Sequence, residues 1–177
     1  VQIFSPDKDL GQCVTGRRVV QIDRRKMSKD GTGLIDEAAV VEKFGVPPSS
    51  IADWLGLVGD TADGFPGLAG WGAKSASAVL AVYRHIENIP DDEARWVADG
   101  VTVRGAAKLA ATLRDNRADA ALFKRIATVA TDVSEDLDIG SVDDWEWRGV
   151  SGQLGKVARE LDMPDVVERA ERIMLTR

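Results

Sequence analysis

Apolar residues recur at helical spacing along most of the chain and form strand-like runs only near its start. The run from Val1 to Phe4 and the weak alternation from Arg18 to Asp23 each predict a short strand. Elsewhere, apolar residues three and four positions apart predict amphipathic helices. We expect these helices at residues 10–14, 37–44, 51–58, 73–83, 106–113, 118–129, 154–161 and 166–175. The pattern therefore predicts a mainly helical chain with a small strand region at its start.

Capping residues refine this outline. Asp36 is expected to cap the helix at 37–44, and Gly45 is expected to end it. The pair Ser49-Ser50 can cap the helix that follows. A polar loop is expected at residues 24–33, after the second strand.

Composition limits the possible functions without selecting one. The chain has 177 residues, which is long enough to bury a hydrophobic core. Its content of 44% hydrophobic and 29% charged residues is that of an ordinary soluble protein. No apolar run approaches the roughly 20 residues that span a bilayer, so no membrane partner is expected. A single cysteine, Cys13, and a single histidine, His85, argue against zinc and favour a reducing, intracellular setting. The net charge of −6 is only a weak objection to nucleic-acid binding. Carboxylates that bind metal lower the total charge of a nuclease and say nothing about where its basic surface lies.

Two pairs of aspartates are candidate ligands for a divalent metal ion. Asp7 and Asp9 follow the first predicted strand, and ligands collect at the carboxyl ends of strands in open α/β sheets. Asp60 and Asp63 lie three residues apart in a glycine-containing segment, so both could face one hard cation. The alternative for the first pair is a helix cap with a solvated charge, and for the second pair a polar turn.

The glycine-rich segment that follows is a candidate phosphate-binding turn. Gly67, Gly70 and Gly72 precede the helix expected from residue 73, and Lys74 and Ser75 stand in its first turn. Glycine lets a phosphate approach the backbone, and the start of a helix offers N–H groups and the positive end of the helix dipole. Glycines alone favour a tight connection between helices. Together with the lysine and the serine, they indicate a helix-hairpin-helix that binds DNA without reading its sequence.

Two further features have open interpretations. Trp71, at the tip of the turn, is either an exposed residue that stacks on DNA or a packing residue between the two helices. The six cations between Arg104 and Arg125 form either a solvated face or additional phosphate contacts.

Three motifs, in this order, resemble the 5′ nuclease (flap endonuclease-like) family. They are Ser5-Pro6-Asp7-Lys8-Asp9-Leu10, Phe44-Gly45-Val46-Pro47-Pro48, and the whole stretch from Ile51 to Leu80. The similarity is nearest to the bacterial 5′-3′ exonuclease domain of the DNA polymerase I type, and it continues through residues 104–106 and 126–133. Gly64-Phe65 stands where the family usually has asparagine followed by isoleucine or leucine, which predicts a looser loop.

This resemblance implies an α/β nuclease (PIN/Rossmann-like) domain remnant followed by a mainly α helix-hairpin-helix (helix-3-turn-helix) domain. Residues 1–45 would be the C-terminal part of the PIN-like nuclease domain, and residues 46–125 the helix-3-turn-helix DNA-binding domain. Residues 126–177 would form a C-terminal helical segment that packs back on the nuclease domain. The N-terminal half of the nuclease domain, with the first metal site, is expected upstream of Val1.

The resemblance also implies roles for individual residues. Four aspartates would be metal ligands and act in catalysis through the metal: Asp7, Asp9, Asp60 and Asp63. The intact enzyme would use two Mg²⁺ or Mn²⁺ ions, of which this chain holds the second. Six residues would bind the phosphates of duplex DNA, with a monovalent cation such as K⁺ at the hairpin: Gly67, Gly70, Trp71, Gly72, Lys74 and Ser75.

The function that follows is a metal-dependent 5′-3′ exonuclease or 5′-flap endonuclease of DNA replication and repair. Its substrate would be duplex DNA with a 5′ end or a 5′ flap, in the bacterial cytoplasm. We expect a monomer when intact, and no activity from this chain without the N-terminal half. The alternative is a non-catalytic helix-hairpin-helix DNA-binding module.

Overall fold

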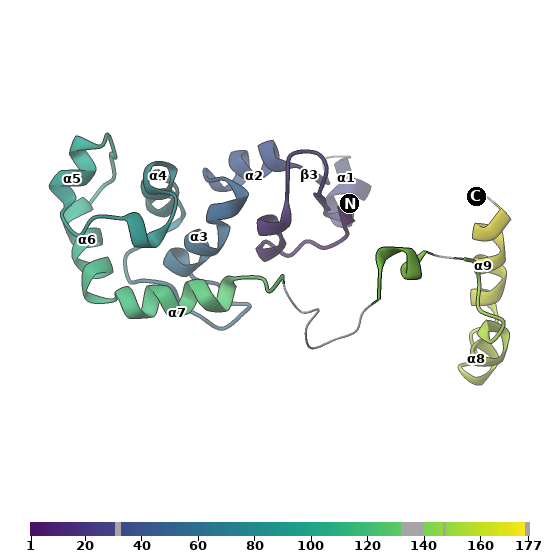
Figure 1. Ribbon diagram of the computed structural model, residues 1–177. Coiled ribbons are helices and arrows are strands. Elements are labelled where there is room, and N and C mark those ends of the chain that lie inside the picture. Colours follow the sequence, from purple (N-terminus) through teal and green to yellow (C-terminus); the bar gives the residue numbers. More distant parts are fainter. Residues whose placement is uncertain (31–32, 132–139, 147, 176–177) are drawn as a thin grey trace. The chain divides into compact units, whose positions relative to one another are not determined.

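The computed structural model describes residues 1–30, 33–131, 140–146 and 148–175, which fall into two units, 1–131 and 132–177. The first unit contains, in chain order, β1 (Gln2–Ile3), the 3-10 helix η1 (Asp9–Cys13), β2 (Val20–Ile22), α1 (Arg24–Asp30), β3 (Leu34–Ile35), α2 (Glu37–Phe44), the 3-10 helix η2 (Pro48–Ser50), α3 (Ile51–Val58), α4 (Ala73–Tyr83), the 3-10 helix η3 (Ile86–Asn88), α5 (Glu93–Ala98), α6 (Ala106–Asp115) and α7 (Arg117–Ala127) (Figure 1). The second unit contains the 3-10 helix η5 (Val142–Trp145), α8 (Leu154–Glu160) and α9 (Asp165–Leu175).

A small sheet with the strand order β1-β2-β3 occupies the beginning of the first unit. β1 and β2 are parallel, with Gln2 opposite Val20, and β2 and β3 are antiparallel, with Gln21 opposite Ile35. The carboxyl ends of β1 and β2 therefore lie at the same edge of the sheet. The segment that contains Asp7 and Asp9 leaves from this edge. The proposal that residues 1–45 are part of a larger PIN-like domain stays a prediction, as do the three domain boundaries.

Most of the predicted helices are confirmed, because their apolar spacing and caps are local signals. The Oδ1 atom of Asp36 accepts the N–H of Ala39 at 3.0 Å, and Gly45 ends α2 with a φ of 71°. The polar loop expected at 24–33 is wrong, since Arg24–Asp30 forms α1. The expected Ser50 side-chain cap is also wrong: its buried hydroxyl has no hydrogen-bond partner.

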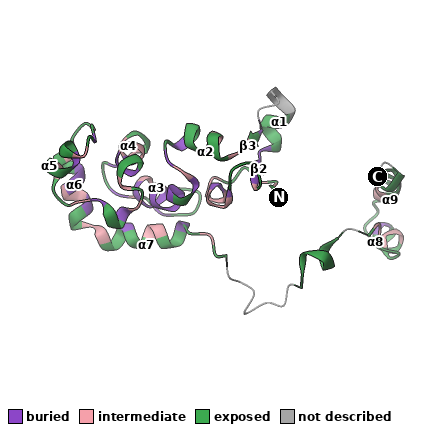
Figure 2. Cartoon of the chain, turned by 45° about the horizontal axis from the view of Figure 1, so that its top comes forward, coloured by how far each residue is buried: buried purple, intermediate pink, exposed green. Residues whose placement is uncertain are grey.

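The core of the first unit is built around α3. Figure 1 shows α3 lying beside α7, and Figure 2 shows that α3 is almost entirely buried. The two helices meet at backbone distance, because a Cβ added to Gly56 would lie 3.0 Å from the backbone nitrogen of Lys124. On the other side, the Ser77 hydroxyl of α4 donates to the carbonyl of Phe44 and accepts the indole N–H of Trp54. α3 is thus packed on one side by α7 and bonded on another to Ser77 of α4.

Within the described residues, none of the helices combines the length and the apolar character needed to cross a bilayer. The second unit is described by itself: α8 and α9 pack on each other, and several large apolar side chains of this unit are exposed, among them Leu161 and Ile173. The expected packing of residues 126–177 on the nuclease domain stays a prediction.

Candidate metal centre and nucleic-acid interface

The segment that carries Asp7 and Asp9 is fixed by two glutamine side chains. Buried Gln21 of β2 donates its amide to the carbonyls of Ser5 and Asp7, so the chain turns tightly after β1. Gln12 of η1 donates to the carbonyl of Asp9 and to that of Ala127, at the end of α7. The sequence gives no signal for either role, because each depends on a partner that is distant along the chain. Together they place Asp9 against the helical core.

The loop after α3 carries Asp60 and Asp63 and is closed by a two-bond bridge. The backbone N–H of Asp60 donates to Phe65, and the N–H of Phe65 donates back, at 2.9 and 3.0 Å. Phe65 is buried and stacks on Phe123 of α7, with ring centroids 5.8 Å apart. The looser loop expected from Gly64-Phe65 is therefore not observed, because the phenylalanine anchors the loop to the core.

Packing brings three of the four candidate metal ligands together. Asp9, Asp60 and Asp63 each offer a carboxylate oxygen, and these oxygens lie within 4.8 Å of one another. Asp7 lies outside this group but lines the adjoining hollow of about 550 Å³, which we call the acidic hollow. Its other lining residues are Ser5, Pro6, Lys8, Lys43, Asp60, Ala62 and Asp63.

The donor set of this acidic cluster (Asp9, Asp60 and Asp63) fits a hard divalent cation. All three ligands are carboxylates, which Mg²⁺ and Mn²⁺ prefer. The Oδ1 atom of Asp9 is buried and has no hydrogen-bond partner, although a buried carboxylate oxygen is normally satisfied. An ion held by the cluster would provide that missing partner. The ligand roles of all four aspartates stay predictions.

The carboxylates of the cluster differ in their electrostatic state. Burial raises the pKa of Asp9, and the neighbouring charges of Asp7, Asp63 and Asp60 raise it further, to about 6. Burial also acts to raise the pKa of Asp60, but hydrogen bonds from Lys8 and from the N–H of Ala62 outweigh it and leave the pKa below its ordinary value. In the folded, metal-free protein the charged form of Asp9 is thus disfavoured, whereas the charged form of Asp60 is favoured.

The raised pKa of Asp9 predicts how the metal-free protein responds to pH. The pKa of Asp9 is about 6 in the folded state and lower in the unfolded chain, so the ionised Asp9 destabilises the folded state at neutral pH. As the pH falls through 6, Asp9 takes up a proton in the folded state and this destabilisation decreases. In EDTA, Asp9→Asn should therefore raise the free energy of unfolding by roughly 1 kcal/mol near neutral pH, after allowance for solvent screening. The gain should shrink as the pH falls through 6. Urea denaturation at several pH values measures this difference. A variant that is less stable than the wild type at neutral pH would contradict it.

A second hollow, of about 480 Å³, lies at the start of α4 and is called here the glycine hollow. A Cβ added to Gly70 or Gly72 would meet no atom within 4 Å, so the backbone there is open to a ligand. The first N–H groups of α4 have no partner within the helix, and Lys74 and Arg104 place two cations at the rim. The remaining lining residues are Ala73, Ser75, Thr102 and Val103.

The other members of the predicted DNA-binding set have structural roles. The Ser75 hydroxyl accepts the N–H of Gly72 and donates to its carbonyl, so it caps α4. Trp71 is buried and packs on Trp96, with ring centroids 6.0 Å apart. The alternative in which Trp71 is an exposed stacking residue is therefore wrong, because its ring forms part of the core. Its indole N–H is buried without a partner.

Gly67 of the glycine-rich turn packs against the backbone at the end of α3, where the loop that carries Asp60 begins. Its φ is +69°, and an added Cβ would lie 2.4 Å from the backbone nitrogen of Gly59. We expect Gly67→Ala to lower the free energy of unfolding by about 3 kcal/mol, because both the clash and the left-handed backbone are unfavourable. Gly64→Ala is a matched control, since its φ is +81° in open space, and should cost about 1 kcal/mol. Equal losses in thermal or urea denaturation would rule out the contact.

The cations between Arg104 and Arg125 do not form one free surface. Arg114 pairs with Asp115, Arg117 pairs with Asp91, and Lys124 pairs with Asp53 and Glu87. Three of the six cations therefore make intramolecular ion pairs, and the interpretation of this cluster as phosphate contacts stays a prediction.

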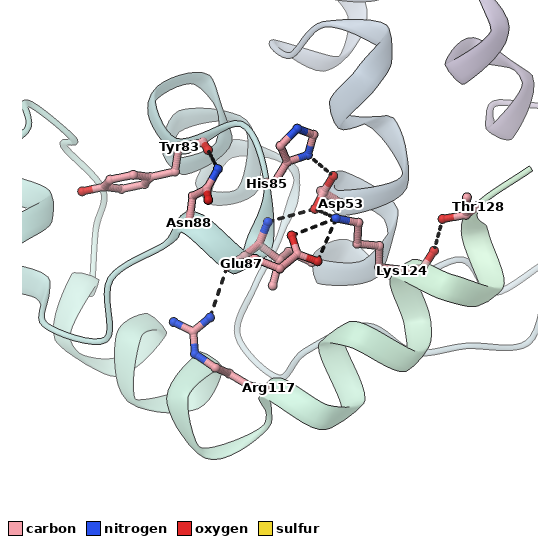
Figure 3. A network of polar contacts seen from close by, with 9 residues as sticks. Asp53, Tyr83, His85, Glu87, Asn88, Arg117, Lys124 and Thr128 are labelled. Carbon is pink, nitrogen blue, oxygen red and sulfur yellow. Dashed lines mark hydrogen bonds and ion pairs between the residues drawn. The ribbon is translucent and has the colours of Figure 1, made fainter.

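Lys124 belongs to a buried network that sequence reasoning missed (Figure 3). Asp53 of α3 is fully buried; its Oδ1 accepts the N–H of Ile86 at 2.9 Å and contacts the Lys124 ammonium at 2.7 Å. Its Oδ2 lies 3.0 Å from Nδ1 of His85, a histidine without an assigned role in the sequence. Burial opposes the charge on Lys124, but hydrogen bonds to Asp53 and Glu87 outweigh it and raise the lysine pKa. The network ties α3, η3 and α7 together.

Carboxylates that can hold divalent ions and a helix start that can bind phosphate are both features of proteins that act on phosphodiesters. Comparison with known proteins identifies the family. The sequence model described as "5'-3' exonuclease, C-terminal SAM fold" matches residues 46–153. The chain belongs to this 5′-3′ exonuclease family.

Individual relatives agree with the family match. DNA polymerase I of Pseudomonas aeruginosa is 34% identical over 147 residues, which cover 78% of this chain and 14% of that protein. DNA polymerase I of Bacillus subtilis is 29% identical over 170 residues, or 96% of this chain and 18% of that protein. A 5′-3′ exonuclease of Aquifex aeolicus is 40% identical over 89 residues, or 50% of this chain and 29% of that protein. The chain thus spans less than a third of each of these relatives.

Proposed function

We propose that this chain carries the duplex-binding part and one metal site of a nuclease that hydrolyses DNA phosphodiesters at 5′ ends or 5′ flaps. The observation that supports this most is the acidic cluster, in which carboxylate oxygens of Asp9, Asp60 and Asp63 lie within 4.8 Å of one another and Oδ1 of Asp9 is buried without a hydrogen-bond partner. The glycine hollow belongs to the same compact unit, and its first lining residue, Gly70, follows Asp63 closely in the sequence.

Each part has a distinct role. Asp9, Asp60 and Asp63 hold the ion, and Asp7 adds negative charge at the edge of the acidic hollow. When bound, Mg²⁺ or Mn²⁺ supplies Lewis-acid stabilisation of the charge on the phosphate oxygens, and an upstream N-terminal half would supply the partner ion. Gly70, Gly72 and the start of α4 bind duplex phosphates and a monovalent cation such as K⁺. The intact protein would act as a monomer in the bacterial cytoplasm.

Cleavage of a labelled 5′-flap duplex by a full-length protein, in which this chain is joined to the proposed N-terminal half, tests this function. We expect cleavage that rises with Mn²⁺ concentration and stops in EDTA. The alternative, a non-catalytic DNA-binding module, predicts salt-dependent binding with no cleavage at any Mn²⁺ concentration.

The glycine hollow makes a separate prediction about DNA affinity. Lys74→Ala and Arg104→Ala should each weaken duplex binding and reduce the slope of log affinity against log salt by about 1, because each removes one phosphate contact. Arg17→Ala is the matched control, since Arg17 is exposed and lines neither hollow. Fluorescence anisotropy at several salt concentrations measures the slope. A change equal to that of the control would exclude these two cations from the interface.

A further inference from the structure

The lysine between Asp7 and Asp9 makes a contact that the proposed metal site does not explain. The Lys8 ammonium lies 2.5 Å from Oδ2 of Asp60, a side chain that is only 4% exposed. Among the described residues, this is the ion pair that reaches the acidic cluster. Lys43 also lines the acidic hollow, but its ammonium lies over the Phe44 ring instead.

The contact occupies an oxygen that a metal ion would need. Oδ1 of Asp60 already accepts the N–H of Ala62 at 3.0 Å, so Oδ2 is the oxygen that has no backbone donor of this kind and is the better candidate for a metal bond. A divalent ion bonded to Oδ2 would lie about 2 Å from that oxygen, and therefore within a few ångströms of the Lys8 ammonium. At that separation two cations repel each other strongly. The ion and the lysine thus compete for Asp60.

The Lys8 side chain can move away from Asp60. Its side chain is 34% exposed, it borders the acidic hollow, and a lysine stem is long and flexible. Until it leaves, its charge partly balances carboxylates that would otherwise repel one another across the cluster. An exchangeable lysine can therefore keep the ligands assembled in the absence of metal.

We propose that Lys8 is an exchangeable counter-ion: it holds Asp60 in the metal-free protein and is displaced when a divalent cation binds. This proposal rests on the proposed metal site. Lys8 acts through Asp60 and is a positioning residue. It sets a threshold for metal binding, because each ion that binds must first break the lysine contact.

Mn²⁺ binding to the full 177-residue chain, measured by electron paramagnetic resonance of free Mn²⁺, tests the proposal. Lys8→Met should bind Mn²⁺ about tenfold more tightly than the wild type, because the lost charge-assisted contact no longer opposes the ion. Lys43→Met is the matched control: it removes the same charge from the same hollow without touching Asp60. It should change the affinity by less than about twofold. Equal effects of the two variants, or an unchanged affinity in Lys8→Met, would overturn the counter-ion role.

Asp60→Asn separates this proposal from the site on which it rests. Loss of Mn²⁺ binding in Asp60→Asn with no change in Lys8→Met overturns the lysine role alone. If Asp60→Asn binds Mn²⁺ as well as the wild type does, the metal site and the lysine role are both overturned. A readout that needs no variant is the ¹⁵N resonance of the Lys8 ammonium in the wild type. It should move towards that of a free lysine when Mg²⁺ is added, and a resonance that stays in place would overturn the exchange.

Discussion

Asp53→Ala is expected to lower the free energy of unfolding of residues 1–131 by about 3–5 kcal/mol, enough to unfold a domain of ordinary stability. The substitution leaves the buried N–H of Ile86 without an acceptor and the ammonium of Lys124 without its buried partner. Loss of one member of a buried charged pair is costly because the remaining charge stays desolvated. Urea denaturation followed by tryptophan fluorescence measures this loss.

Asp91→Ala is the matched control for this experiment. Asp91 pairs with Arg117 at 2.6 Å, but its side chain is 54% exposed, and Arg117 keeps its bonds to the carbonyls of Ile86 and Ile89. Its loss should cost less than about 1 kcal/mol. If the two variants lose similar stability, the buried network does not hold α3, η3 and α7 together.

Asp60→Asn should lower both Mn²⁺ affinity and flap cleavage by the full-length protein at least about a hundredfold. Asparagine keeps the shape of the side chain and can still accept the N–H of Ala62, so the loop should stay folded. It removes the charge that an ion needs, and loss of even an outer partner of a metal ligand costs about 10–100-fold. Calorimetric titration with Mn²⁺ and the flap assay measure the two effects.

The control for Asp60→Asn is Asp115→Asn, which removes an exposed carboxylate at the end of α6. It should leave both Mn²⁺ affinity and cleavage unchanged. Full cleavage by Asp60→Asn would remove Asp60 from the proposed mechanism.

The sequence predicts the helices better than it predicts the contacts between them. The helix at 37–44 could be located because Asp36 and Gly45 are local signals that need no tertiary partner. Helix α1 is not predicted, because five of its seven residues are charged and they show no apolar period. Helix α5 is short, and only burial of Trp96 against Trp71 reveals its place in the core.

The candidate site shows the same division. The pairing of Asp60 with Asp63 follows from their spacing, and the open backbone at Gly70 and Gly72 follows from their residue type. The position of Asp9 next to Asp60 and Asp63 does not follow from the sequence, because it depends on the contact of Gln12 with the end of α7. The roles of Lys8 and Asp53 also depend on distant partners, and isolated charges in a sequence do not reveal which carboxylate or amine they will meet.

The most direct test of the central claim is anomalous diffraction from crystals of this protein soaked in Mn²⁺. The proposed function predicts an anomalous peak bonded to carboxylate oxygens of Asp9, Asp60 and Asp63, with the Lys8 ammonium moved away from Asp60. A peak elsewhere on the molecule, or none at a saturating Mn²⁺ concentration, would contradict the claim that these three carboxylates form a metal site.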